Sequence, residues 1–200
     1  PLGIEMLNHL RSNIDYLLIG RFFSLDELGM YFFAFNAGLG ISLNAINMVT
    51  NSVFPYLCEV RGDRTQLKKS YAKSLKIVAL IMIPLVLTQT SLAPFYVPIV
   101  FDPKWTTAIP ILMMICLSGI PRAFALVSEQ LLLTVDRGMD GLKWNIFFTL
   151  LFIGAILVGV QFNIFVVAAI VLGVHMVCLP AFSWWVSRSV FSKKEMLSSS

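Results

Sequence analysis

Residues 164–186 read IFVVAAIVLGVHMVCLPAFSWWV, a run that contains no Asp, Glu, Lys or Arg. A helix needs about 20 mainly apolar residues to cross the roughly 30 Å hydrocarbon core of a bilayer. This run therefore predicts a membrane-spanning helix. Because a helix satisfies its backbone hydrogen bonds internally, as lipid requires, the run favours an all-α integral membrane protein.

The composition of the whole chain supports the same class. Of 200 residues, 58% are hydrophobic and only 13% are charged, whereas a soluble domain has about 25% charged residues. The polar surface is therefore too small to cover a water-soluble particle. The formal net charge of +4 is not arranged as a basic stripe with interleaved aromatics, so we expect no nucleic-acid partner.

Six segments are apolar and long enough to predict transmembrane helices, at about 2–23, 28–57, 75–92, 109–135, 144–161 and 164–186. The second and fourth exceed the minimum length, so we expect them to tilt, bend or protrude. Residues 93–108 hold three prolines among aromatics, which predicts a short irregular segment at the outer interface. Residues 161–163 predict a tight turn, and residues 191–200 a cytoplasmic tail.

Basic residues concentrate in 59–76, in 136–143 and after the sixth span, whereas the other side of the membrane receives Arg21 and Lys104. The positive-inside rule then predicts that both ends of the chain are cytoplasmic. Within the first basic segment, residues 63–76 are amphipathic, with Leu67, Tyr71 and Leu75 recurring every four residues. Two interpretations remain open here: a helix on the anionic inner leaflet, or an extension of the third span.

The first span carries polar residues on one face, namely Asn8, Arg11, Ser12 and Asp15. An ionisable group at mid-bilayer costs about 2.5–3.5 kcal/mol, so each one needs a partner or a wet cavity. Arg11 and Asp15 are four residues apart and within reach of each other. They indicate either a cavity wall that meets a polar ligand or a neutral pair that only joins helices.

The second span carries a row of amides, with Asn36, Gly40, Asn44, Asn47 and Asn51 at helical spacing. Amide groups donate and accept hydrogen bonds without charge, which suits sugar hydroxyls. The alternative is hydrogen bonding between helices, about 0.6–2 kcal/mol per contact. Gly38 and Gly40 favour that alternative, because small residues permit close packing.

The fourth span carries Arg122 and Glu129, and Pro121 predicts a kink beside the arginine. The two charged residues are seven positions apart, about 10 Å along the helix axis, which is too far for an ordinary close pair. Arg122 therefore indicates a contact with an anion or with an acid on another span, such as Asp15. A purely structural ion pair is the alternative.

No arrangement in the sequence indicates catalysis or a metal. His9 and His175 are isolated, and the three cysteines lie far apart without ligand spacing. No nucleophile–base arrangement appears, so we expect neither an enzyme nor a cofactor.

Several motifs resemble one known family, in the same order. They are NIDYLLIGRF at 13–22, ELGMY at 27–31, Phe54-Pro55, the basic loop with Arg64 and Lys68, and the outer segment with Ala93-Pro94, Val97-Pro98, Phe101, Lys104-Trp105 and Ala108-Ile109-Pro110. Over residues 8–145 the chain resembles Wzx-type polysaccharide flippases of the multidrug/oligosaccharidyl-lipid/polysaccharide exporter superfamily. It departs from their pattern at Asp102-Pro103 and Asp136-Arg137.

The resemblance implies a two-lobe bundle, with residues 1–190 as the C-terminal six-helix lobe and the N-terminal lobe outside this fragment. It implies a bacterial inner-membrane protein that flips an undecaprenyl-pyrophosphate-linked oligosaccharide from the inner to the outer leaflet by alternating access. Membrane lipids and the N-terminal lobe would be further partners. The binding candidates are Arg122, Arg11, Asp15, Asn36, Asn44 and Asn47, and the ion-coupling candidates are Asp15 and Glu129.

Three alternatives stay open. A drug or cation exporter of the same superfamily would need a carboxylate-rich cavity. A glycolipid-processing protein such as a polymerase would usually need a large outer loop. A membrane scaffold would leave the internal charges and amides unexplained.

Overall fold

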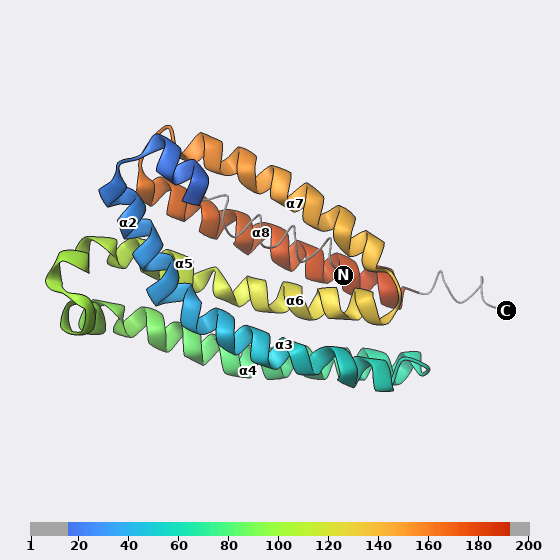
Figure 1. The fold of residues 1–200 in the computed structure, drawn as a ribbon. Helices are drawn as coiled ribbons and strands as arrows, with labels where there is room; N and C mark the ends of the chain where they lie inside the picture. The colour runs from blue at the N-terminus through green and yellow to red at the C-terminus, as the bar shows by residue number, and fades with distance from the viewer. Residues whose placement is uncertain (1–15, 193–200) are drawn as a thin grey trace.

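The computed structural model describes residues 16–192, except for the side chains of residues 41, 43, 45 and 49. The described part is all-helical (Figure 1). After a helical stretch at 16–22, the elements are α2 (Leu25–Ala34), the π-helical turn η1 (Phe35–Leu39), α3 (Gly40–Glu59), α4 (Arg64–Tyr96), the π-helical turn η2 (Val97–Phe101), the 3-10 helix η3 (Pro103–Ala108), α5 (Ile109–Leu117), α6 (Gly119–Thr134), α7 (Gly138–Gly159) and α8 (Ile164–Phe191). The predicted all-α class is confirmed.

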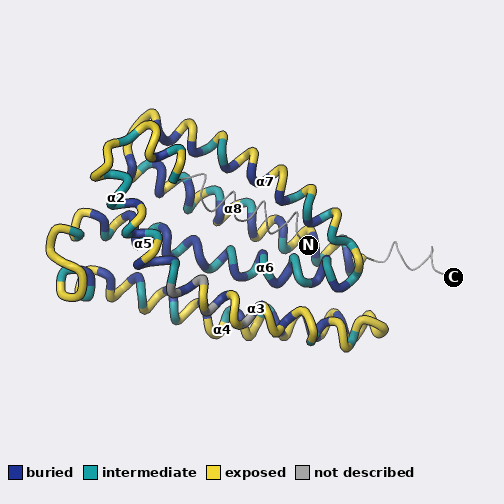
Figure 2. Tube along the Cα trace, viewed as in Figure 1, coloured by how far each residue is buried: buried dark blue, intermediate teal, exposed yellow. Residues whose placement is uncertain are grey.

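Helix α6 forms the centre of the bundle. It contacts α3 and α4 on one side and α8 on the other, and α7 packs against α8 (Figure 1). In the most apolar 18-residue stretch of the segment Pro103–Thr134, which contains α5 and α6, 61% of residues are buried. The corresponding stretches of the other three long apolar helices are 28–33% buried. The outer helices α4 and α7 alternate buried and exposed residues (Figure 2). Their exposed side chains include Leu80 and Leu150, as expected of helices that face lipid.

Four described helices are long and apolar enough to cross a membrane: Arg64–Phe101, Pro103–Thr134, Gly138–Gly159 and Ile164–Phe191. They correspond to the third to sixth predicted spans. The second predicted span is helical through α2, η1 and α3. Residues 1–15 of the first span lie outside the described residues.

The helix that contains the third predicted span is longer than the span itself. Helix α4 begins at Arg64, where the Asp63 carboxylate accepts hydrogen bonds from the backbone N–H groups of Thr65 at 2.8 Å and Gln66 at 3.1 Å. Leu67 and Tyr71 are each only 3% exposed. Because the apolar face of residues 63–76 packs inside the bundle, this stretch is an extension of the span. The helix on the leaflet surface was the wrong alternative.

The segment 93–108 is more regular than predicted. Pro94 lies inside α4, and the chain stays helical up to Phe101. The break falls at Asp102, whose φ of 147° and ψ of 144° no helix accommodates. Phe33 of α2 then stacks on Trp105 with ring centroids 4.4 Å apart and meets Phe101 edge-on at 5.0 Å. These ring contacts hold the segment against α2.

The kink predicted at Pro121 is present as the break between α5 and α6 at Ser118. A proline ring clashes with the carbonyl four residues earlier, here that of Leu117, so the helix breaks one turn before the proline. At the break, a Cβ on Gly119 would lie 3.0 Å from Cδ1 of Leu39. Because Gly119 has no side chain, Leu39 of η1 can pack directly against α6 at this point.

The described parts of the basic segments at 59–76 and 136–143 meet at one end of the bundle, where the C-terminal end of α8 also lies (Figure 1). Arg61 forms an ion pair with Asp136. Arg64 donates hydrogen bonds to the backbone carbonyls of Val190 at 2.6 Å and Ser192 at 2.9 Å. The predicted grouping of these segments on one side is therefore consistent with the fold.

Candidate functional site

The predicted amide row lies on an exposed face of α2–η1–α3. Asn36, Asn44, Asn47 and Asn51 are all exposed. Asn36 donates a hydrogen bond to the backbone carbonyl of Phe32, one turn back, at 2.8 Å. Within residues 16–192, no side-chain hydrogen bond joins the other three asparagines to another helix. We call Asn36, Asn44, Asn47 and Asn51 the amide face.

The exposure of the amide face has an energetic consequence. An amide moved from water into an apolar medium without a hydrogen-bond partner costs on the order of 2–7 kcal/mol. The opposite face of α3 buries Ile46, Val53 and Leu57 in the bundle. The helix is therefore two-sided, and its amide side needs a polar neighbour outside the described residues of this chain.

A glutamine from α4 holds the π-helical turn beside the amide face. The Gln89 side-chain amide donates hydrogen bonds to the carbonyls of Ala37 at 3.0 Å and Gly38 at 2.5 Å. Its oxygen accepts a hydrogen bond from the Ser42 hydroxyl at 2.9 Å. A Cβ on Gly38 would lie 2.9 Å from the Cys116 sulfur, so only glycine fits there without rearrangement.

Arg122 extends from α6 toward the same turn. Its guanidinium carbon lies 6.0 Å from the centroid of the Phe35 ring, within the range of a cation–π contact. The residue is half-buried. The predicted relation between Arg122 and Asp15, and the position of Arg11, lie outside the described residues.

Glu129, two turns further along α6, contacts α7. The Asn145 side chain donates a hydrogen bond to the Glu129 carboxylate at 2.7 Å and another to the Gly141 carbonyl at 3.2 Å. Asn145 is only 2% exposed. The structure therefore places Arg122 near η1 and Glu129 near α7, and these two candidates contact different elements.

Sequence reasoning missed Gln89 and Asn145. Both are polar residues inside predicted apolar spans, so the cost argument applied to Arg122 would have singled them out. Their hydrogen-bond partners could not be predicted, because they depend on which helices pack together. Among the described residues, no group of three His, Cys, Asp or Glu side chains is arranged to hold a metal ion.

The fold and the candidate site define a multi-pass, all-α membrane protein with a polar face on one helix. Residues 2–110 match the family model described as "Polysaccharide biosynthesis protein". That match covers more than half of the chain, so the chain belongs to the polysaccharide biosynthesis protein family.

Three bacterial relatives are similar to the chain. It is 30% identical over 157 residues to "Lipopolysaccharide biosynthesis protein WzxC" of Escherichia coli strain K12, which covers 78% of this chain and 32% of the relative. It is 30% identical over 145 residues to "Teichuronic acid biosynthesis protein TuaB" of Bacillus subtilis strain 168, covering 72% and 30%. It is 26% identical over 166 residues to "Uncharacterized membrane protein in cps region" of Klebsiella pneumoniae, covering 83% and 34%.

The chain spans about a third of the length of these curated relatives. No solved structure matches it.

Proposed function

We propose that this chain is one lobe of a two-lobe transporter that flips a lipid-linked oligosaccharide across the bacterial inner membrane. The names of the similar proteins concern lipopolysaccharide and teichuronic acid biosynthesis, and both of these products contain sugars. The headgroup crosses from the inner to the outer leaflet, while the lipid chain stays in the bilayer. The protein acts as a transporter and catalyses no covalent step.

The observation that carries this proposal is the exposed amide face. Sugar hydroxyls both donate and accept hydrogen bonds, and so do the side chains of Asn44 and Asn47. Each such hydrogen bond replaces one to water, so it stabilises the bound state by only about 0.5–1.5 kcal/mol net. A headgroup can therefore slide along α3 without being trapped. In this proposal the amide face lines a wet chamber between the two lobes.

Arg122 and Arg11 are the proposed phosphate-binding residues of this lobe. A pyrophosphate linker is strongly anionic, and a guanidinium binds phosphate oxygens through two parallel hydrogen bonds. Arg122 lies beside Phe35 of η1, the residue that precedes Asn36 of the amide face in the sequence. Asp15 and Glu129 are the proposed ion-coupling acids, since a transporter that alternates between two states needs an energy source.

The π-helical turn η1 offers a bending point for alternating access. π-helical turns inside α-helices are frequent at functional sites. Here the turn separates α2 from α3, and Gln89 is hydrogen-bonded to its carbonyls. We propose that α2 and α3 change their mutual angle at η1 as the chamber opens toward one side and then the other.

A test of the amide face replaces Asn44 and Asn47 together by leucine in the full-length protein. Translocation of a fluorescent lipid-linked oligosaccharide in proteoliposomes is expected to slow at least tenfold, because two hydrogen-bonding positions are lost at about 1 kcal/mol each.

The matched control is Thr88→Leu, which removes an exposed polar side chain from α4 and should leave the rate unchanged. A double variant that translocates at the wild-type rate would remove the amide face from the mechanism. A drug or cation exporter, by contrast, would keep its transport of cations in this variant.

A further inference from the structure

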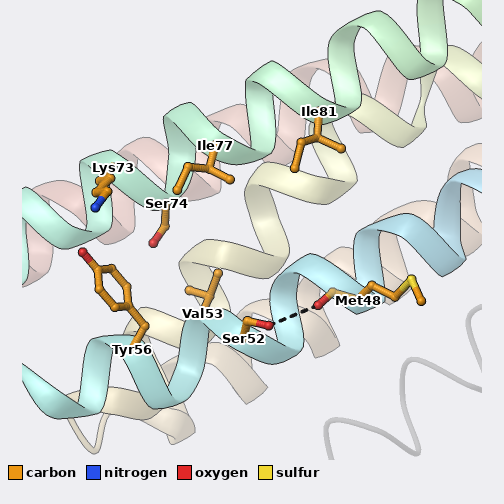
Figure 3. A pocket seen from close by; sticks show the side chains of 8 residues that line it. All are labelled: Met48, Ser52, Val53, Tyr56, Lys73, Ser74, Ile77 and Ile81. Carbon is orange, nitrogen blue, oxygen red and sulfur yellow. Dashed lines mark hydrogen bonds between the residues drawn. The ribbon is translucent and has the colours of Figure 1, made fainter.

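A groove of about 500 Å³ lies between α3 and α4 (Figure 3). The residues that line the groove are mainly apolar, and Lys73 is the one charged residue among them. The lining residues are Met48, Ser52, Val53, Tyr56, Lys73, Ser74, Ile77 and Ile81. Volumes of about 300–1,000 Å³ are typical of small-molecule sites, so the groove is large enough to hold a stretch of hydrocarbon chain.

The groove has a charged end and an apolar end. On α4, Lys73, Ile77 and Ile81 follow one another at intervals of four residues, along about 12 Å of helix. The Lys73 ammonium lies 5.8 Å from the centroid of the Tyr56 ring on α3. Lys73 is on the side of the groove nearer the basic end of the bundle, and Ile81 is nearer the middle of the span. A lipid in one leaflet has the same order, with phosphate at the interface and chain inward.

The groove adjoins the amide face on the same helix. Met48 and Ser52 line the groove, and Asn47 and Asn51 precede them in the sequence. Neighbouring residues point about 100° apart on a helix of 3.6 residues per turn. Asn51 lies five residues before Tyr56, about 7.5 Å along the helix axis. The amide face therefore begins near the charged end of the groove and runs beside it toward the middle of the span, along the path of a head that leaves Lys73.

We infer that the α3–α4 groove docks the polyprenyl chain of the lipid-linked oligosaccharide, and that Lys73 binds its phosphate before the head enters the chamber. This inference rests on the proposed function, and it adds an entry site to it. The chain lies against Met48, Ile77 and Ile81, which are 76%, 42% and 40% exposed and otherwise meet bulk lipid. Lys73 supplies the charge complementary to phosphate.

The test measures binding of radiolabelled undecaprenyl phosphate to the full-length protein in phosphatidylcholine nanodiscs. Ile77→Trp fills the groove and Lys73→Gln removes its charge, so each is expected to weaken binding about tenfold. The matched controls are Leu80→Trp and Lys76→Gln, on the same helix but outside the groove, which should bind within twofold of wild type. Unlabelled phosphatidylglycerol at tenfold excess should displace less than half of the label.

Two results would overturn the inference. The first is equal binding by Ile77→Trp and Leu80→Trp, which would show that the groove holds no chain. The second is full displacement by phosphatidylglycerol, which would assign the groove to ordinary anionic phospholipid.

Translocation by the same proteins in liposomes separates this inference from the proposed function. If wild type translocates a lipid-linked oligosaccharide and Ile77→Trp does so equally well, only the groove assignment fails. If wild type does not translocate it at all, the proposed function fails, and the groove loses its assignment as an entry site with it.

Discussion

At the scale of single residues, the strongest constraint on the chain is the cost of polar groups in lipid. Asn145 is buried, and its side-chain NH2 group donates two hydrogen bonds, to Glu129 and to the carbonyl of Gly141. Asn44 and Asn47 are exposed, and no other helix in the described part of the chain forms a hydrogen bond with their side chains. The same residue type thus serves two purposes, and only the packing of the helices distinguishes them.

Arg122 gives the sharpest prediction at this scale. Arg122→Ala in the full-length protein is expected to reduce translocation at least tenfold, because a hydrogen bond to a charged group contributes about 1.5–3 kcal/mol. Arg122→Lys keeps the charge but loses the two-pronged geometry, so its rate should lie between wild type and Arg122→Ala. The measurement is the initial rate of oligosaccharide translocation at equal protein level.

The matched control is Arg188→Ala on α8, where the guanidinium lies 4.1 Å from the Trp184 ring centroid at the exposed surface. This variant should transport normally. Wild-type rates for both Arg122 variants would contradict a role of Arg122 in binding phosphate.

At the scale of elements, Gln89 and η1 form one structural unit. Gln89→Leu would remove the hydrogen bonds to the carbonyls of Ala37 and Gly38 and the one from the hydroxyl of Ser42. An intramolecular hydrogen bond contributes about 0.5–1.5 kcal/mol net. We therefore expect a lower midpoint of thermal unfolding for the full-length protein in detergent, with Thr88→Leu on the same helix as the neutral comparison. Equal midpoints for the two variants would show that Gln89 does not hold the turn.

Much of the element order could be predicted from the sequence, because long apolar runs have few alternatives in lipid. Pro121 also indicated the break at Ser118 correctly. The start of α4 at Arg64 could not be predicted, since a basic amphipathic stretch suits either a leaflet surface or a packed extension. Burial of Leu67 and Tyr71 decides between the two, and burial depends on the whole bundle.

The candidate site could be predicted only in part. The amide face was visible as a helical repeat of asparagines, because spacing of three and four residues keeps side chains on one face. The hydrogen bonds of Gln89 to η1 could not be predicted from the sequence, because they join residues about 50 positions apart. They also depend on a π-helical turn that no local sequence pattern predicts. Asp102 was likewise missed as the point where the helix ends.

At the scale of the whole molecule, charge varies along the length of the bundle and polarity varies across it. Along the bundle, the basic segments gather at one end, where Arg61 meets Asp136 and Arg64 meets the end of α8. Across the bundle, α3 buries one side and exposes its amides on the other. The first distribution suits the positive-inside rule. The second suits a chamber shared with another lobe, as in transporters built from two halves.

The central claim is that the amide face of α3 meets water inside the membrane, and thiol accessibility tests it most directly. In a full-length background in which every native cysteine, including Cys58, Cys116 and Cys178, is replaced by serine, Asn47→Cys is compared with Leu80→Cys, which is exposed on α4. A charged, membrane-impermeant maleimide should label Asn47→Cys rapidly and Leu80→Cys at least tenfold more slowly, because only a wetted thiol ionises and reacts. Equally slow labelling at both positions would place the amide face in lipid or in a dry interface, and would contradict the account.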